Sequence, residues 1–513
     1  MRFGQQMLGA PPGFFTSLVP VVVDAFKDAF PELEKRQDFV MEVVAEEEES
    51  FERMLSGGIK YFNDISEELV KKGDKTVSGE SAFYLYDTMG FPVDLTQVMA
   101  EEKGLTVDVS GFEKEMENQK QRSRDAALMK KSGGGAPLVL TVDETAHLQK
   151  AKVKTTDDAQ KYEWDVSPSA NVLAVFSHSG WIADGDSADG EYESVGVVLD
   201  STTFYAEAGG QVGDTGSLVT SSGAEIEVAD TQSYAGYILH VGRVAKGSIK
   251  VGESVTLKVD YERRRKIAPN HSMTHILNYA LRQVLEGDVD QKGSLCDEGK
   301  LRFDFTAKGA LSTEQLSEVE KICREQVASA RKADAQVIPL EKAMSINGLR
   351  AVFGEKYPDP VRVITFGNTI DDMVKDPESD KWLDGSLELC GGTHVSNTAE
   401  AKAFTLIQEE AVAKGVRRIT AFTGELAEAT LKSAEALEAK FAKAEKLPAL
   451  EMGAAVTDLR KEVDTIDISC VLKAGMRTRL DAMSKKYMDE KKANASVVVN
   501  QAIEAAKVWI LLD

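Results

Sequence analysis

The sequence predicts a multidomain α+β protein that begins and ends in helical segments. Apolar residues recur at helical spacing within residues 1–130. Short β-branched and aromatic runs, separated by Gly, Asp and Ser, fill residues 138–260, and helical and strand patterns alternate over 261–424. Residues 425–513 are rich in Ala, Glu, Lys and Leu. At about 100–200 residues per domain, the 513 residues make about three or four such parts.

The composition excludes several classes of protein. With 61 Lys+Arg against 84 Asp+Glu, the formal net charge is −23, which disfavours unselective binding of nucleic acid but leaves room for a local basic patch. The four cysteines do not suit a disulfide-stapled secreted scaffold. No apolar run approaches the ~18–20 residues that span a bilayer, and Gly9, Pro11, Pro12 and Gly13 interrupt any signal-peptide core. We therefore expect a cytoplasmic protein with no membrane partner.

The first predicted domain is helical and spans residues 1–130. Its helical periodicity is clearest between residues 13 and 66 and returns in the charged segment Glu113–Arg124. An aromatic-rich segment, 81–96, lies between these two stretches. The composition changes at the Gly-rich stretch Lys131–Pro137, which is the best candidate for a linker.

The remainder of the chain is predicted to hold three further parts. Residues 138–260 are expected to form an antiparallel, barrel-like β unit, and residues 261–424 an α+β domain. Residues 425–513 contain few helix breakers, so helical hairpins or a coiled coil are expected there, with a surface through which the protein can self-associate. Strand-like runs of the β unit include Val172–Phe176, Val195–Leu199, Glu225–Val228 and Val255–Val259.

The candidate metal centre combines two short motifs. His271-Ser-Met-Thr-His275 opens a segment of helical periodicity, and its i, i+4 spacing puts both imidazoles on one helix face. Cys390-Gly-Gly-Thr-His394 adds a thiolate and a third imidazole, and a Cys-His₃ set favours one Zn²⁺. The alternative is that the two motifs have separate structural roles. A zincin-type protease is excluded because Ser272 stands where such an enzyme needs its general-base Glu.

Together with Glu388-Leu-Cys-Gly-Gly-Thr-His-Val395, the paired histidines resemble the editing domain of alanyl-tRNA synthetases and their free-standing relatives. Upstream, Tyr86–Leu95 resembles the helical tRNA-recognition region of the same family. The resemblance extends from near the start of the chain to about residue 424. Further blocks that are similar to the family, in the expected order, are Thr203–Gly216, Gln291–Ser294, Leu301–Phe305, Phe353–Tyr357 and Gly415–Ile419.

The resemblance implies a role for each part of the chain. It makes residues 1–130 a helical tRNA-recognition domain, 138–260 a β-barrel-like subdomain of the editing region, 261–424 a zinc-binding editing domain and 425–513 a coiled-coil-like segment. Because the start Met1–Gly4 resembles the interior of the family's helical region, we expect the class II catalytic core to be missing from this chain and to lie upstream. ATP is then a cofactor only if that core is present. A transit peptide would also lie upstream, so an organelle stays an alternative to the cytoplasm.

The function implied by the resemblance is hydrolysis of mischarged Ser-tRNA(Ala) and Gly-tRNA(Ala) at the zinc site, with tRNA(Ala) as the partner. A first alternative is the full ATP-dependent alanine–tRNA ligase, of which this chain would be the central and C-terminal part. A second is a non-catalytic zinc-containing RNA-binding module. Four protein ligands are typical of a structural zinc site and three plus water of a catalytic one, so Cys390 is expected to be the most expendable ligand for folding.

Five further residues are candidates near the scissile ester. Gln291 is expected to hydrogen-bond there or to be a surface amide. Gly209 and Gly210 allow close backbone approach to the aminoacyl group or form a tight turn. Thr393 is a candidate reader of the serine hydroxyl or a cap of its own loop. Asp304 is expected to orient a ligand histidine or to be a satisfied carboxylate at a strand end.

Two basic clusters are candidates for contact with the acceptor end of the tRNA. One immediately precedes the metal helix and the other lies near the end of the same domain, and both stand out from an acidic background. The alternative is an ordinary solvated basic turn. The residues concerned are Arg263, Arg264, Arg265, Lys266, Arg417 and Arg418.

Overall fold

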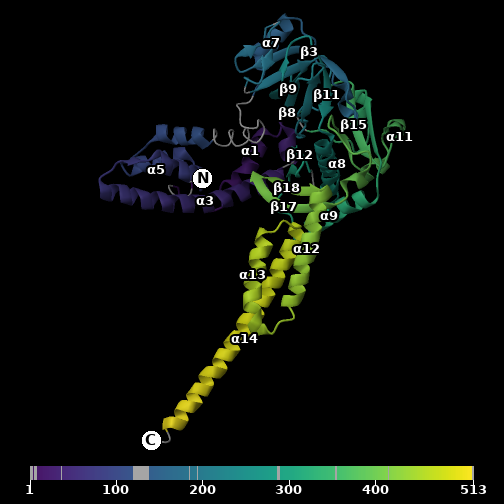
Figure 1. The fold of residues 1–513 in the computed structure, drawn as a ribbon. Helices are drawn as coiled ribbons and strands as arrows, with labels where there is room; N and C mark the ends of the chain where they lie inside the picture. The colour runs from purple at the N-terminus through teal and green to yellow at the C-terminus, as the bar shows by residue number, and fades with distance from the viewer. Residues whose placement is uncertain are drawn as a thin grey trace. The chain divides into compact units, whose positions relative to one another are not determined.

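The computed structural model divides the chain into two compact units, residues 1–137 and 138–513 (Figure 1). The finer division into four domains stays a prediction, and the predicted linker Lys131–Pro137 lies outside the described residues. Within the described part of the chain, every helix is too short or too polar to cross a membrane. The structure describes residues 4, 8–35, 37–119, 138–183, 185–192, 194–285, 289–352, 355–413 and 415–510.

The first unit is built mainly from helices. Its apolar residues between 13 and 66 do not form one continuous helix, because Pro31 occupies the first position of a new helix, where a proline suits the helix start. Phe62 and Phe91 are buried in the core of this unit, and residues 109–119 are also helical. The other elements are η2 (Thr16–Leu18), α1 (Val19–Phe26), α2 (Pro31–Lys35), α3 (Gln37–Lys72), β1 (Thr76–Val77), α4 (Gly79–Asp87), α5 (Val93–Glu102) and β2 (Thr106–Val107).

The second unit begins with a closed antiparallel barrel, which confirms the predicted barrel-like part of the fold. The strands follow the order β11-β7-β8-β9-β6-β3, and β11 pairs with both β7 and β3, so the sheet closes on itself (Figure 1). Val197, Leu218 and Ile226 are buried in its core, as expected where alternate side chains of each strand point inwards.

The barrel region contains both short and long elements. These are α7 (Val142–Lys150), η3 (Ala159–Tyr162), β3 (Ser169–Ser177), β4 (Gly180–Trp181), β5 (Ala188–Asp189), β6 (Val195–Leu199), β7 (Gly216–Thr220), β8 (Glu225–Tyr234), β9 (Tyr237–Lys246), β10 (Ser248–Ile249) and β11 (Ser254–Val259).

The α+β part is organised around the 24-residue helix α8 (Tyr261–Val284). The Asp260 side chain caps this helix by accepting a hydrogen bond from the Arg263 N–H. The helix packs against a four-stranded antiparallel sheet with the order β12-β13-β18-β17, and Met273 and Leu277 are fully buried in the shared core. A second sheet, β14-β15-β16, supports the segment that contains Cys390.

The remaining elements of the α+β part alternate between helix and strand. They are β12 (Gln291–Cys296), β13 (Leu301–Thr306), α9 (Thr313–Ala328), β14 (Ala333–Ile338), α10 (Leu340–Met344), β15 (Val361–Phe366), α11 (Ile370–Lys375), η4 (Asp380–Asp384), β16 (Leu387–Leu389), η5 (Thr398–Ala401), β17 (Phe404–Ala413) and β18 (Val416–Thr423).

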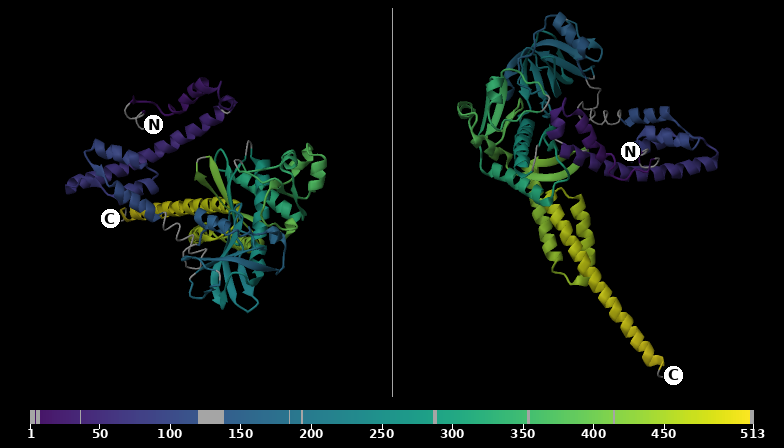
Figure 2. Two further views of the ribbon diagram at one scale, coloured as in Figure 1. Left: turned by 90° about the horizontal axis from the view of Figure 1, so that it is seen from above. Right: turned by 180° about the vertical axis from the view of Figure 1, so that it is seen from behind.

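The second unit ends in α12 (Gly424–Ala444), η6 (Ala449–Glu451), α13 (Met452–Thr465) and α14 (Cys470–Ile510). Leu437, Phe441, Leu459 and Leu480 are buried where these helices pack together. Helix α14 continues beyond the ends of α12 and α13, as both views in Figure 2 show. The helical character predicted for this segment is therefore confirmed, whereas a coiled coil and self-association stay predictions.

Candidate metal centre

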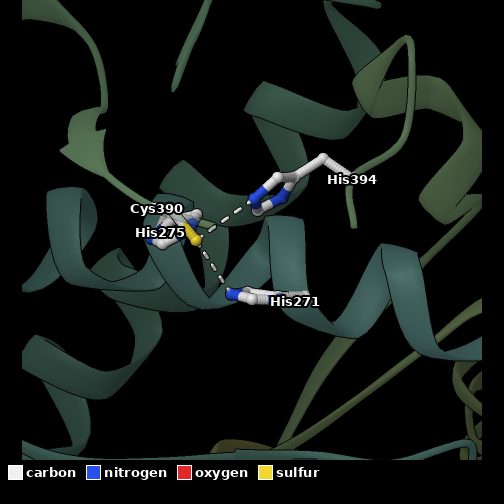
Figure 3. Close-up of side chains that lie close together, drawn as sticks. All are labelled: His271, His275, Cys390 and His394. Atoms are coloured by element: carbon white, nitrogen blue, oxygen red, sulfur yellow. Dashed lines mark hydrogen bonds between the residues drawn. The ribbon is translucent and has the colours of Figure 1, made fainter. Parts of the chain in front are cut away.

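The four predicted ligands meet in one cluster, although 119 residues separate His271 from Cys390. Helix α8 places His271 and His275 on successive turns, and the segment after β16 supplies Cys390 and His394. All four candidate ligand atoms lie within 4.8 Å of one another. The Cys390 Sγ lies 3.3 Å from His271 Nε2 and 3.4 Å from His394 Nε2 (Figure 3). A tetrahedral ion with bonds of about 2.0–2.3 Å separates its ligand atoms by roughly 3.3–3.8 Å, so the two Cys390–histidine distances and the Cys-His₃ chemistry of the set fit Zn²⁺.

Gln211 orients the first ligand and holds the loop that carries two others. Its Oε1 lies 2.6 Å from His271 Nδ1 and accepts a hydrogen bond from the Thr393 N–H at 2.9 Å. Its Nε2 donates to Thr393 Oγ1 at 2.8 Å, and the side chain is fully buried. Because Oε1 can only accept, His271 carries its proton on Nδ1 and leaves Nε2 free for a metal. Gln211 lies within the block that resembles the family, but its spacing from the histidines gave no signal of this role.

Glu388 orients the second ligand histidine. Its Oε2 lies 2.6 Å from His275 Nδ1, and its Oε1 accepts a hydrogen bond from Asn278 Nδ2 at 2.8 Å. The other ring nitrogen, His275 Nε2, is buried and has no hydrogen-bond partner among the described residues. A buried nitrogen without a partner is costly, and coordination to a metal would satisfy it. In the sequence, Glu388 stood out only as the first residue of the Glu388–Val395 motif.

Ser272 orients the third ligand histidine. Its Oγ lies 3.1 Å from His394 Nδ1 and accepts a hydrogen bond from the Val395 N–H at 3.1 Å. All three ligand histidines therefore have a polar partner at Nδ1, which is the arrangement expected around a metal bound through Nε2.

Burial and mutual charge set the protonation of the ligands. Burial opposes the thiolate of Cys390, but the three neighbouring imidazoles outweigh it and hold the pKa of the thiol well below its ordinary value. Burial lowers the pKa of His394 to about 3. Burial also disfavours a charged His275, but Glu388 and Cys390 raise the pKa of His275 to about 10. A thiolate and a neutral imidazole are the forms that bind Zn²⁺, and its binding would displace the proton of His275.

The loop between Cys390 and His394 is held closely over α8. A Cβ atom on Gly392 would overlap the ring of His271, so only glycine fits there. The Arg362 guanidinium donates to the carbonyl oxygens of Cys390 and Gly392 at 2.9 and 3.0 Å. Tyr162 donates to the Gly391 carbonyl at 3.0 Å, and Arg362 lies over the Tyr162 ring. These contacts fix the direction of the thiolate.

The candidate substrate residues lie beside this centre. Gly209 and Gly210 form a tight turn with positive φ, and a Cβ on Gly210 would overlap Ser294 of β12. Gln291 donates to Ser294 Oγ at 3.2 Å, and Ser294 in turn donates to the Gly209 carbonyl at 3.3 Å. Thr393 is buried, and its hydrogen bonds go to Gln211 rather than to its own loop. The turn and β12 therefore form one hydrogen-bonded patch next to the ligands.

Asp304 does not contact a ligand histidine. Its two carboxylate oxygens accept hydrogen bonds from the Arg418 guanidinium at 2.7 Å each, across the β13–β18 pair. Arg417 is paired with Glu409 in the same way. Cross-strand ion pairs therefore occupy the Asp304 carboxylate and the Arg417 and Arg418 guanidinium groups. The role of orienting a ligand histidine, expected of Asp304, belongs to other side chains.

The basic run Arg263–Lys266 lies in the first turns of α8, not before that helix as the sequence predicted, and it does not act as one patch. Arg264 is fully buried, where it pairs with Asp214 and donates to the carbonyls of Lys161, Glu163 and Thr203, so the expectation that it contacts RNA is wrong. Residues one apart on a helix point about 100° apart, so a run of four cannot share one face. Of the other members, Arg263 is half-buried and pairs with Glu298, Arg265 is exposed and pairs with Asp165, and Lys266 is exposed.

Three family models match the chain. One, described as tRNA synthetases class II (A), matches residues 1–263, and one described as threonyl and alanyl tRNA synthetase second additional domain matches residues 361–420. The third, described as alanine–tRNA ligase domain, matches residues 427–490. The class that these matches define is the class II tRNA synthetases. Because the class II match begins at residue 1, it does not support our expectation that the class II core is missing.

Relatives that match nearly the whole of this chain define the family more narrowly. The mitochondrial alanine–tRNA ligase of Saccharomyces cerevisiae is 39% identical over 490 residues, which cover 94% of this chain and 49% of that protein. The cytoplasmic enzyme of Bombyx mori is 37% identical over 529 residues, covering 99% and 54%. Alanine–tRNA ligase 1 of Lachnoclostridium phytofermentans is 35% identical over 521 residues, covering 99% and 53%. The chain belongs to the alanyl-tRNA synthetase family, and it spans about half the length of these relatives.

Proposed function

We propose that this chain works as part of an alanine–tRNA ligase and that its residues 138–423 remove wrong amino acids from tRNA(Ala). Family membership supports the ligase part of the proposal, and the names of the relatives favour it over an editing hydrolase alone. The use of ATP belongs to that ligase reaction. Both mitochondrial and cytoplasmic relatives occur, so a cytoplasmic location stays a prediction.

A second, hydrolytic site is needed because a single binding pocket discriminates poorly between similar amino acids. A pocket built for alanine cannot exclude the smaller glycine, and it rejects serine poorly because serine adds only a hydroxyl group. Such differences are worth about 1–3 kcal/mol, which is too little for accurate protein synthesis. Hydrolysis of the wrong ester after its formation corrects the error.

The observation that carries the proposal is the buried Cys-His₃ cluster with a polar partner on each histidine. When held by all four residues, Zn²⁺ would orient the end of the substrate, and when held by three of them it would have an open position at which to polarise a water molecule. His271, His275 and His394 would hold it through Nε2, and Cys390 through Sγ. In the reaction, water adds to the acyl carbon, the bond from that carbon to the ribose oxygen breaks, and this oxygen takes a proton.

The residues around the Gly209–Gly210 turn are proposed to receive the aminoacyl end. Gln291 and Ser294 supply polar groups there, and the turn brings a backbone carbonyl beside them. Thr393 is positioned by Gln211 one residue from the ligand His394, which supports a role in reading the serine hydroxyl. Exposed Lys266 and Arg265 remain candidates for contact with phosphates of the acceptor end.

Deacylation of Ser-tRNA(Ala) tests the proposal directly. We expect the zinc-loaded protein to release serine much faster than buffer does, and Ala-tRNA(Ala) to be spared. His394→Ala should lower zinc content and hydrolysis together, because it removes one ligand atom. Cys390→Ala should keep the fold while lowering zinc affinity. Zinc is measured on the same samples by atomic emission.

The exposed His178 provides the control, since His178→Ala is the same change outside the cluster. A protein that binds zinc and keeps its fold but releases no serine above the buffer rate would instead support the non-catalytic RNA-binding module. Full hydrolysis by a zinc-free His394→Ala variant would contradict the role given to the metal.

A further inference from the structure

We infer that Arg282 and Arg350 form an anion site beside the metal centre, which binds a backbone phosphate of the RNA strand that leads to the ester. The inference rests on the proposed function and names the residues that hold its substrate. Neither arginine belongs to the basic clusters that the sequence predicts.

Arg282 lies on the same side of α8 as the ligand histidines. It follows His275 by seven residues, or about two turns, which places it roughly 10 Å farther along the helix axis. Asn278, between them, contacts Glu388, so this face of the helix is turned towards the β16 segment. Within the described part of the chain, Arg282 forms no ion pair, and its Nε is buried without a hydrogen-bond partner.

Arg350 approaches the same place from another segment. Its N–H donates to the Leu387 carbonyl at 3.0 Å, and its carbonyl accepts from the Leu389 N–H at 3.1 Å, so its backbone pairs with β16 next to Glu388. Its side chain is exposed, and it too forms no ion pair with a described residue. Burial first, and then the like charge of nearby Arg350, lower the pKa of Arg282 to about 10. Glu388 acts in the opposite direction and offsets this lowering only in part, so the charges of the two arginines lie near enough to repel each other.

Glu388 favours the charged form of Arg282 but forms no ion pair with either arginine. Both oxygens of Glu388 are engaged, one by His275 and the other by Asn278. By contrast, Arg264, Arg417 and Arg418 all have carboxylate partners. Two neighbouring guanidinium groups that form no ion pair with a described carboxylate are an unfavourable arrangement that an anion relieves.

A phosphodiester of single-stranded RNA is the anion that suits this place. The proposed substrate has its ester at the metal centre, so the strand leading to that ester must pass close by. The chain carries a net charge of −23, which repels RNA unless positive charge is concentrated near the site. Arginine binds phosphate oxygens through its planar fork of N–H donors.

The test begins with binding of a labelled single-stranded RNA ending in CCA to the zinc-loaded full chain. We expect Arg282→Gln and Arg350→Gln each to weaken binding about 5- to 10-fold and to reduce the slope of log affinity against log salt by about 0.7. Arg282→Lys should restore part of the affinity. Arg243→Gln, the same change on β9 of the barrel, should alter affinity less than about 2-fold. Wild-type affinity and salt slope in both Gln variants would overturn the inference.

A kinetic comparison separates this site from the metal chemistry. The substrates are the seryl ester of a CCA trinucleotide, which contains phosphodiesters, and the seryl ester of adenosine, which contains none. We expect both Gln variants to raise KM for the trinucleotide ester and to leave the adenosine ester and the zinc content unchanged. Equal loss on both substrates would overturn the inference, because it would indicate general damage. Inorganic phosphate that saturates the arginines without displacing RNA would also overturn it.

The two proposals fail in different ways. If the wild-type protein hydrolyses neither ester, deacylation is wrong, and the RNA-binding measurement still decides the anion site. If hydrolysis occurs and the arginine variants behave as wild type on both substrates, deacylation stands and the anion site is wrong. Because Arg350 is exposed, its variant tests the site even if Arg282→Gln does not fold.

Discussion

Three residues outside the predicted ligand set hold the orientation of the histidines that would bind the metal. Gln211, Glu388 and Ser272 each contact the Nδ1 atom of one ligand histidine. Each contact selects one ring orientation and leaves Nε2 facing the Cys390 thiol. The candidate site is therefore preorganised, and we expect its affinity for a metal to depend on these three partners.

Gln211→Leu should weaken zinc binding about 10- to 100-fold, the usual effect of losing such a partner. The change removes the contact with His271 and leaves the buried Thr393 N–H without an acceptor. Zinc affinity is measured by competition with a chromophoric chelator. Gln232→Leu is the matched control, because Gln232 is a partly buried glutamine of β8 with partners outside the metal cluster. Equal zinc affinity in the two variants would show that Gln211 does not support the metal centre.

Arg264→Ala should lower the free energy of unfolding by about 3–5 kcal/mol, because it leaves the buried carboxylate of Asp214 unpaired. It should not lower RNA affinity in the fraction that stays folded. The neighbouring Lys266→Ala should change stability by less than about 0.5 kcal/mol, since Lys266 is exposed. Urea unfolding of both variants checks the difference. Similar free energies of unfolding in the two variants would mean that the Arg264–Asp214 ion pair contributes little to stability.

Among the elements, the barrel and α8 depend on each other. The barrel contributes Gln211 to the metal centre and Asp214 to the start of α8, and both lie in the connection that precedes β7. The helix contributes two ligands, and its apolar residues fill the core shared with the β12-β13-β18-β17 sheet. A shift of α8 along its axis would therefore break the ligand cluster and the barrel contacts together.

The barrel should lose stability as the pH falls from about 6.5 to about 4. His240 is fully buried between the Thr202 hydroxyl and the Val197 carbonyl, and burial lowers the pKa of His240 to about 4. The pKa of this histidine in the unfolded chain is 6.5, so below that pH the unfolded chain binds a proton that the folded barrel does not bind. The stabilisation is complete above pH 6.5 and decreases by about 3 kcal/mol towards pH 4.

Hydrogen exchange of the barrel amides at pH 7 and pH 4.5 measures this loss. His240→Gln should flatten the difference between the two pH values, whereas His178→Gln, at an exposed position, should not. The same steep decrease in His240→Gln as in the wild type would assign it to other groups.

The whole molecule consists of two units, and the candidate metal centre lies within one of them. All four ligands and the three side chains that orient them belong to residues 138–513. A fragment of residues 138–513 should therefore bind zinc with the affinity of the full chain, within about 2-fold. The measurement is zinc competition together with circular dichroism. A folded fragment that binds zinc much more weakly would show that residues 1–137 contribute to the centre.

Local patterns in the sequence were sufficient for the broad architecture and for the four residues that form the candidate metal cluster. The i, i+4 histidines and the Cys-x₃-His segment are short-range signals, and short β-branched and aromatic runs separated by Gly, Asp and Ser predicted the barrel. The role of Arg264 was missed because a run of charges was treated as a surface patch, although helix geometry turns one of its members inwards. Asp304 was missed for a related reason, since its partner Arg418 lies 114 residues away.

By itself, the sequence determined the family, the helical and strand character of each stretch, and which residue types are able to bind a metal. Only the tertiary structure decided that residues 119 apart share one cluster and that Gln211 and Glu388 orient it. It also decided that Arg282 and Arg350 lie near each other without an ion pair to a described carboxylate. The physical reason is that secondary structure follows from interactions within a few residues along the chain. A binding site depends on distances through space, and these are set by the packing of the barrel, α8 and the β16 segment.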